Sequence, residues 1–114
     1  MKQLFRNIEQ WGKDKGILDK ATPLDQFRKT LEEVDELREA LEAQAQGLEQ
    51  FTNSKGILVN TQEEINDAIG DITVTLTLQA KLQNTTIEEC VQGAYNIISK
   101  RTGKIINGQF VKDE

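Results

Sequence analysis

The chain has no histidine, one cysteine and one proline among its 114 residues. Without histidine, neither a Ser-His-Asp nor a Cys-His nucleophilic site can be built. Zinc sites ligated by histidine and the Glu-x-x-His di-iron sites of helical bundles are excluded for the same reason. The lone cysteine cannot form a disulfide within the chain, which is typical of a reducing compartment. Chemistry in this protein must therefore use carboxylates, amines, hydroxyls and a bound metal.

Long apolar runs and an excess of positive charge are also missing. No segment approaches the ~20 apolar residues that cross a bilayer, and residues 1–11 show no signal-peptide pattern. The 14 Lys and Arg are outnumbered by 19 Asp and Glu, giving a formal net charge of −5. Nucleic acids and membranes are anionic, so neither is expected as a partner. We predict a soluble, cytoplasmic protein with a single domain over residues 1–114.

Apolar residues recur every three or four positions along four stretches, which is the spacing of one helix face. The predicted helices cover residues 2–11, 22–47, 61–83 and 85–102. The second has a long apolar stripe that is expected to face the core. Its members are Leu24, Phe27, Leu31, Val34, Leu37, Leu41, Ala45 and Leu48. The predicted fold class is therefore all-α, a four-helix bundle.

Side chains that can close helix ends support this assignment. Thr22 can cap the second helix, with Pro23 at its first position. Thr61 with Glu64 has the spacing of a capping box at the start of the third helix. The β-branched residues 72–75 could also form a strand, but the continuous apolar face around them favours a helix.

The C-terminal part carries two further signals. Its helix is expected to begin at Thr85 or Thr86, and Cys90 belongs to the apolar side of that helix, where we expect it to fill the core. Beyond the helix, Asn107-Gly108 stands between short apolar pairs, which indicates a type I′ β-hairpin. A hairpin this short is marginal without a surface to pack on.

Acidic residues on two helices form a candidate metal site. Glu33 and Glu36 lie on the flank of the second helix's apolar stripe. Glu64, Asp67 and Asp71 share one face of the third helix, and that face continues as apolar residues. An unpaired carboxylate at such a boundary is costly, and a cation would relieve the cost. If the two helices pack antiparallel, oxygen ligands alone would meet, which favours Mg²⁺ or Mn²⁺. The alternative is a solvated acidic surface, because one Glu-x-x-Glu pair is a weak motif.

These motifs, in this order, resemble those of the MazG-like pyrophosphohydrolases. Residues 29–41 resemble the first signature, Glu-x-x-Glu, and residues 63–76 resemble the second, Glu-x-x-Asp. Segments 11–26 and 87–104 are similar to those of small, phage-type members, so the resemblance covers most of the chain. One position departs from the pattern, since Ala68 stands where the family has the second signature's Glu.

The resemblance implies Mg²⁺-dependent hydrolysis of a nucleoside or deoxynucleoside triphosphate to the monophosphate and pyrophosphate. Glu33, Glu36 and Asp71 would bind the metal, with Asp67 or else Glu64 replacing the missing carboxylate. Glu33 or Glu36 would hold or deprotonate the attacking water.

The candidate substrate contacts are cationic, aromatic and amide side chains. They are Trp11, Lys29, Tyr95, Asn96, Lys100, Arg101 and Lys104. The core is the favoured position for Trp11, because it completes an apolar stripe, and the cations after the fourth helix could equally offset the helix dipole. Relatives of this kind form dimers or tetramers, so we expect a homodimer or homotetramer that completes the bundle. The competing reading is a non-catalytic helical module that binds nucleotide or another protein.

Overall fold

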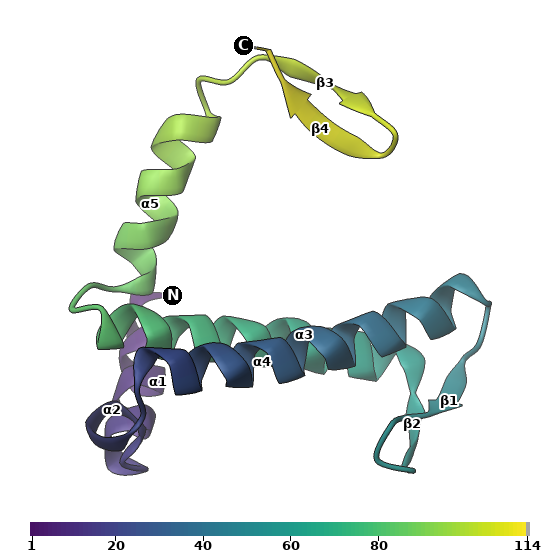
Figure 1. The fold of residues 1–114 in the computed structure, drawn as a ribbon, viewed down its shortest axis with the longest axis horizontal. Coiled ribbons are helices and arrows are strands. Elements are labelled where there is room, and N and C mark those ends of the chain that lie inside the picture. The colour runs from purple at the N-terminus through teal and green to yellow at the C-terminus, as the bar shows by residue number, and fades with distance from the viewer. Residues whose placement is uncertain (114) are drawn as a thin grey trace.

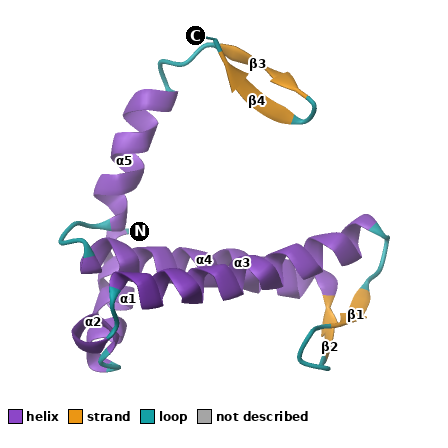
Figure 2. Cartoon of the chain, viewed as in Figure 1, coloured by secondary structure: helices purple, strands orange, loops and turns teal. Residues whose placement is uncertain are grey.

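The computed structural model describes residues 1–113 as a mostly helical chain with two small antiparallel sheets (Figures 1 and 2). The helices are α1 (Lys2–Asp14), α2 (Ile17–Lys20), α3 (Pro23–Ala45), α4 (Thr61–Leu82) and α5 (Ile87–Ile98). The strands are β1 (Gln50–Thr52), β2 (Leu58–Asn60), β3 (Gly103–Ile106) and β4 (Gln109–Lys112). The four predicted helices and the C-terminal hairpin are confirmed. Within the described residues, no helix is both long and apolar enough to cross a membrane.

The long helices α3 and α4 run antiparallel and form the body of the molecule (Figure 1). At the start of α3, the Thr22 hydroxyl accepts a bond from the Asp25 N–H, and the Asp25 carboxylate accepts one from the Thr22 N–H. The predicted cap of α4 is wrong. Asn60 caps this helix by accepting from the Glu63 N–H at 2.9 Å, because strand β2 holds it one residue before the first turn. Thr61 instead donates to the Leu48 carbonyl at 2.7 Å.

Two short elements escaped the sequence analysis. The four-residue helix α2 follows Gly16, whose φ of 80° favours glycine. Strands β1 and β2 form a hairpin in the α3–α4 connection, with Phe51 opposite Val59. Asn53 shapes its turn, accepting bonds from the N–H groups of Lys55 and Ile57 at 3.0 Å. Both elements are too short to produce a periodic apolar signal.

The contact between α3 and α4 is made by small and polar side chains rather than by leucines. Ala40 is fully buried there, and Gln26 donates from its side chain to the Thr75 carbonyl at 3.1 Å. Thr30 donates to the Thr75 hydroxyl at 2.9 Å. The predicted core stripe is largely exposed in the single chain, so that expectation is wrong. Its exposed members are Leu24, Phe27, Leu31, Val34, Leu41, Ala45 and Leu48. Small residues allow the two helices to approach closely, and the bulky stripe is turned away from their contact.

Helix α1 packs across α4 at a point where there is no room for a side chain. A Cβ added to buried Gly12 would lie 2.4 Å from Cδ2 of Leu78, which is itself only 2% exposed.

We expect Gly12→Ala to lower the free energy of unfolding by about 1–3 kcal/mol through overpacking. Gly70→Ala is the matched control. Gly70 lies inside α4 with nothing within 4 Å of its added Cβ, so alanine should stabilise by about 0.5–1 kcal/mol. Urea denaturation measures both; equal effects would contradict the packing described.

Helix α5 and the second hairpin form an arm that projects from one end of the α3–α4 pair (Figure 1). Arg6 of α1 anchors its first turn, with Nη2 2.7 Å from Oε2 of Glu88 and 2.9 Å from Oε2 of Glu9. Thr86 caps α5 by accepting from the Glu89 N–H. Cys90 is exposed, so its predicted role as core filler is wrong for the single chain, because only Ile87 and Glu88 of α5 are half-buried and the rest of the helix is exposed.

The arm ends in the predicted hairpin. Asn107 and Gly108 have φ of 52° and 78°, the positive values that a type I′ turn requires. Ile106 pairs with Gln109 across this turn.

Candidate functional site

Three carboxylates meet where α3 lies beside α4. Glu33, Glu36 and Asp71 each offer one oxygen, and these oxygens lie within 4.8 Å of one another. The Glu pair is brought together by its spacing of three residues on one helix, and Asp71 is added by the antiparallel packing of α4. These three residues are referred to below as the acidic triad. The sequence analysis predicted that acidic residues of these two helices would meet, and the triad takes two residues from α3 and one from α4.

Glu33 is the buried member of the triad and lacks its full set of partners. Only 8% of the residue is exposed, and among residues 1–113 nothing hydrogen-bonds to its buried Oε2. Its Oε1 lies 3.5 Å from Nζ of Lys29. A buried carboxylate oxygen without a donor is costly, and a hard cation is the group that oxygen ligands of this kind bind best. The donor set therefore fits Mg²⁺ or Mn²⁺.

The pKa directions agree with a site that has too much negative charge. Burial is the largest cause that raises the pKa of Glu33, followed by the neighbouring carboxylates of Glu36 and Asp71, while Lys29 opposes them. Burial also raises the pKa of Asp71, and the charges of Asp67 and Glu36 add to the effect. Both groups are thus easier to protonate than ordinary carboxylates, and a bound cation would reverse this tendency.

The other two predicted ligands are not part of the triad. Asp67 is exposed one turn before Asp71 and acts on it through its charge. Glu64 is half-buried in the first turn of α4, beside a small recess that it shares with Glu36 and Glu39. The structure therefore brings together three of the five predicted ligands.

Lys55 is a functional candidate that the sequence analysis missed. Its Nζ lies 3.2 Å from Oε1 of Glu36, so it places a cation beside the triad. The loop that carries it is tied to α3, since the N–H and hydroxyl of Ser54 donate to the Glu39 carboxylate at 2.9 and 3.1 Å. Periodicity cannot identify a single lysine in a turn. The only sequence signal was the Asn53 to Gly56 turn that turns Lys55 back toward α3.

A cavity of about 210 Å³ adjoins the triad between α1, α3 and α4. Its lining residues are Trp11, Ile17, Gln26, Lys29, Glu33, Asp71, Val74, Thr75 and Leu78. A second cavity of about 310 Å³ shares Trp11, Asp71 and Val74 with it, so the two are neighbours. Trp11 is 46% exposed, which makes it a wall of this space rather than a core residue. Together they give an apolar space with a few charged groups, as small-molecule sites have.

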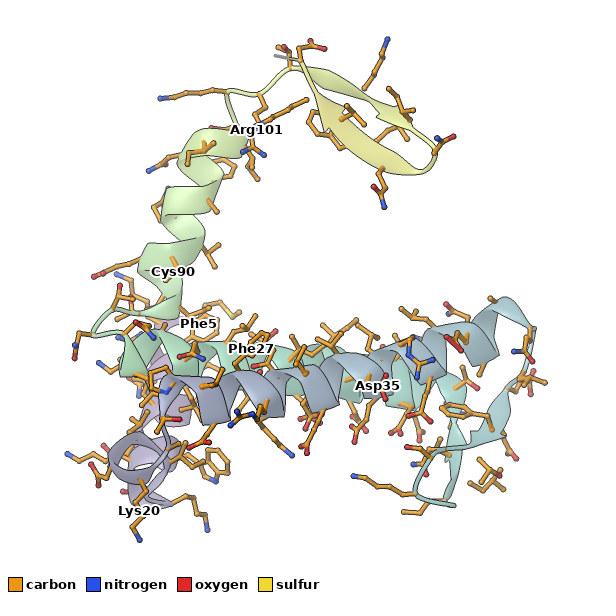
Figure 3. All side chains as sticks on the ribbon, viewed as in Figure 1. Phe5, Lys20, Phe27, Asp35, Cys90 and Arg101 are labelled. Carbon is orange, nitrogen blue, oxygen red and sulfur yellow. The ribbon has the colours of Figure 1, made fainter. Side chains whose placement is uncertain are left out.

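The remaining predicted substrate contacts lie on the arm. Tyr95, Asn96, Lys100 and Lys104 are exposed on α5 and after it. Figure 3 shows Arg101 at the outer end of α5, away from α3. Within one chain, these residues do not join the triad, whereas Lys29 and Trp11 do lie beside it.

Comparison with known proteins gives one phage relative. The chain is 33% identical over 81 residues to an uncharacterized 18.2 kDa protein from the rep-hol intergenic region of Haemophilus phage HP1. The match covers 71% of this chain and 40% of the relative, so the chain spans well under half the length of that protein. No known protein family matches the chain, and no solved structure does.

Proposed function

We propose that the protein is a Mg²⁺-dependent nucleoside-triphosphate pyrophosphohydrolase of the MazG-like kind. It would convert a nucleoside or deoxynucleoside triphosphate to the monophosphate and pyrophosphate. The observation that carries the proposal is the buried, unpartnered oxygen of Glu33 within the acidic triad, directly beside a cavity. The order of the two acidic motifs, which resembles that family, supports the same reaction.

Each part of the site has a role in this reaction. Glu33, Glu36 and Asp71 would hold the metal, which supplies charge neutralisation for the phosphate oxygens. Glu33, the buried member of the triad, would also accept a proton from the attacking water. Lys29, beside Glu33, and Lys55, beside Glu36, would bind the outer phosphates. Trp11 offers a partly exposed aromatic face for stacking of the base.

The proposed assembly is a homodimer or homotetramer in which a second copy completes a MazG-like bundle. The apolar stripe on α3, which nothing covers within residues 1–113, would form the contact. Burying such a stripe against its symmetry mate produces a self-complementary, two-fold interface.

A non-catalytic helical module that binds nucleotide or a partner protein is the second candidate. The same exposed stripe favours it, because a large uncovered apolar face is typical of interaction surfaces. The two candidates differ in what they predict for product formation. Incubation with each nucleoside and deoxynucleoside triphosphate plus Mg²⁺ should release pyrophosphate and monophosphate in equal amounts from the enzyme. Absence of both products for every nucleotide would favour the binding module.

Lys55→Met tests the loop cation. We expect KM for the triphosphate to rise about 10- to 100-fold, because a hydrogen bond to a charged group contributes ~1.5–3 kcal/mol. Binding of Mg²⁺ alone, followed by calorimetry, should not weaken, since Lys55 competes with the metal for Glu36. Lys81→Met, near the far end of α4, is the matched control and should leave both quantities unchanged. A wild-type KM in Lys55→Met would remove this lysine from the site.

Cys90→Ala provides a check on the excluded thiol chemistry. Cys90 is exposed on the arm, outside the triad and its cavity. We expect the variant to keep full pyrophosphohydrolase activity in a steady-state assay. A complete loss would show that the reaction depends on the thiol.

A further inference from the structure

A single copy exposes more surface than a compact protein of its size. Its accessible surface is 8352 Å², whereas a folded monomer of 12.9 kDa has about 6,300 Å². Its radius of gyration is 16.8 Å, against roughly 13 Å for a compact chain of this length. The excess of about 2,000 Å² is more than the ~800 Å² that each partner buries in an ordinary stable interface. The chain therefore exposes more than enough surface to form a stable interface.

Much of this excess lies on the arm. Every residue from Glu89 to Asp113 is exposed, and strands β3 and β4 contact chiefly each other. The exposed residues include bulky apolar side chains on both parts of the arm. They are Val91, Tyr95, Ile97, Ile98, Ile105, Ile106, Phe110 and Val111. A two-stranded hairpin is only marginally stable in water unless it packs against another surface.

The body of the molecule offers a matching surface, because the α3–α4 layer has two different faces. Phe27 and Glu36 are nine residues apart on α3, which is two and a half helical turns, so they lie on opposite sides. The triad is on one side, while Phe27, Ile69 and Leu76 are exposed elsewhere on the layer. Figure 3 shows Phe27 on the edge of α3 that faces the arm.

Charge also separates between the outer part of the arm, residues 99–112, and the body. Residues 99–112 contain Lys100, Arg101, Lys104 and Lys112 and no acidic residue. Helices α3 and α4 together contain eleven Asp and Glu against four Lys and Arg. Opposite charges of this kind steer two copies together and set their orientation.

We propose that the arm, residues 87–113, is exchanged between two copies of this chain. The apolar sides of the two α3–α4 layers pack together, and each arm runs past its partner's layer to the side that carries the triad. The lengths allow this. The 12 residues of α5 rise about 18 Å, whereas packed helices are separated by about 8–10 Å. The end of α5 and the hairpin then set Lys100, Arg101 and Lys104 beside the partner's triad.

The exchange accounts for two separate features. It covers the apolar residues of the arm, and it brings the cations after α5 to the anionic site that they do not reach in their own chain. Their assignment to substrate phosphates rests on the proposed function, but the exchange itself does not. The partner copy therefore contributes residues without which each site is incomplete.

Cross-linking of the full chain tests the exchange without relying on activity. Isotopically labelled and unlabelled chains are mixed and reassociated, then treated with a carbodiimide that joins lysine to a touching carboxylate. We expect linked peptides that pair Lys100 or Lys104 with an acidic residue of α3 or α4, one labelled and one unlabelled. Links formed only within one chain, or no arm-to-body links at all, would overturn the proposal.

Light scattering gives an independent readout. Phe110→Asp, in the exposed hairpin, should weaken the dimer at least tenfold, while Gln109→Asp on the alternate face should not. A dimer equally stable in both variants would also overturn the exchange.

A mixing experiment then separates this proposal from the proposed function. Glu33→Gln is combined with Lys100→Ala/Arg101→Ala/Lys104→Ala, each inactive alone. Reassociated dimers should recover about a quarter of wild-type activity, because half are mixed and each of these has one site with both parts intact. Inter-chain cross-links without activity in the wild type would support the exchange and reject the hydrolase. Wild-type activity without recovery on mixing would reject the exchange alone.

Discussion

Glu33→Gln is expected to lower pyrophosphate release by about three orders of magnitude, within the 10²–10⁴ range for a lost general base. The change keeps the size of the side chain and removes the charge that faces Glu36 and Asp71. Because Glu33 is both a proposed metal ligand and the proposed base, kcat should carry most of the loss. Steady-state kinetics at saturating Mg²⁺ measures it.

Glu32→Gln is the matched control for this prediction. Glu32 is the neighbouring residue, its side chain is 67% exposed, and it also contacts Lys29, at 3.1 Å. The same chemical change there should alter activity less than twofold. Comparable losses in both variants, or a loss below tenfold in Glu33→Gln, would show that the buried position has no special role.

The second large effect concerns stability without metal. Glu33 and Asp71 have pKa values raised above the ordinary ones, so the folded state holds their protons more tightly than the unfolded chain does. Their contribution to stability is therefore greatest in acid, and it is lost as pH rises from the ordinary carboxylate range, about pH 4, through the raised values. Metal-free Glu33→Gln should consequently melt at a higher temperature than the wild type at pH 7, and the difference should shrink at pH 4.

Added Mg²⁺ should reverse that order. At one hundred times its Kd the ion adds about 2.7 kcal/mol to a folded state that binds it, which raises Tm by several degrees in a domain of this size. Glu33→Gln should gain little. Thermal melts at pH 4 and pH 7, with and without Mg²⁺, give the Tm of the wild type and of Glu33→Gln in all four conditions. If Glu33→Gln were less stable than the wild type in every condition, the Glu33 carboxylate would stabilise the fold without a metal, which would contradict this prediction.

The helices were predictable because their signals are local. The alternation of apolar residues and the caps at Thr22 and Thr86 depend only on neighbours in sequence, as does the Asn107-Gly108 turn. The orientation of α3 was not predictable in this way. Its leucine-rich stripe was predicted to face the core, but Ala40 and Thr30 face α4, because close approach of the two helices needs small side chains. Periodicity identifies an apolar face and not the surface that will cover it.

Part of the candidate site was also predictable from spacing along the helices. Glu33, Glu36 and Asp71 converge because their spacing on two helices fixes their sides once the helices pair. The sequence could not exclude Asp67 and Glu64, since they share one face of α4 with Asp71 and only packing separates the three. Lys55 reaches Glu36 through a turn, a relation that no spacing rule describes.

Anomalous diffraction from crystals soaked in Mn²⁺ would show whether the acidic triad binds a metal ion. We predict a single strong peak within coordination distance of Glu33, Glu36 and Asp71, and no such peak in Asp71→Asn crystals. If Mn²⁺ were absent from this place, or bound only elsewhere on the surface, the triad would not be a metal centre.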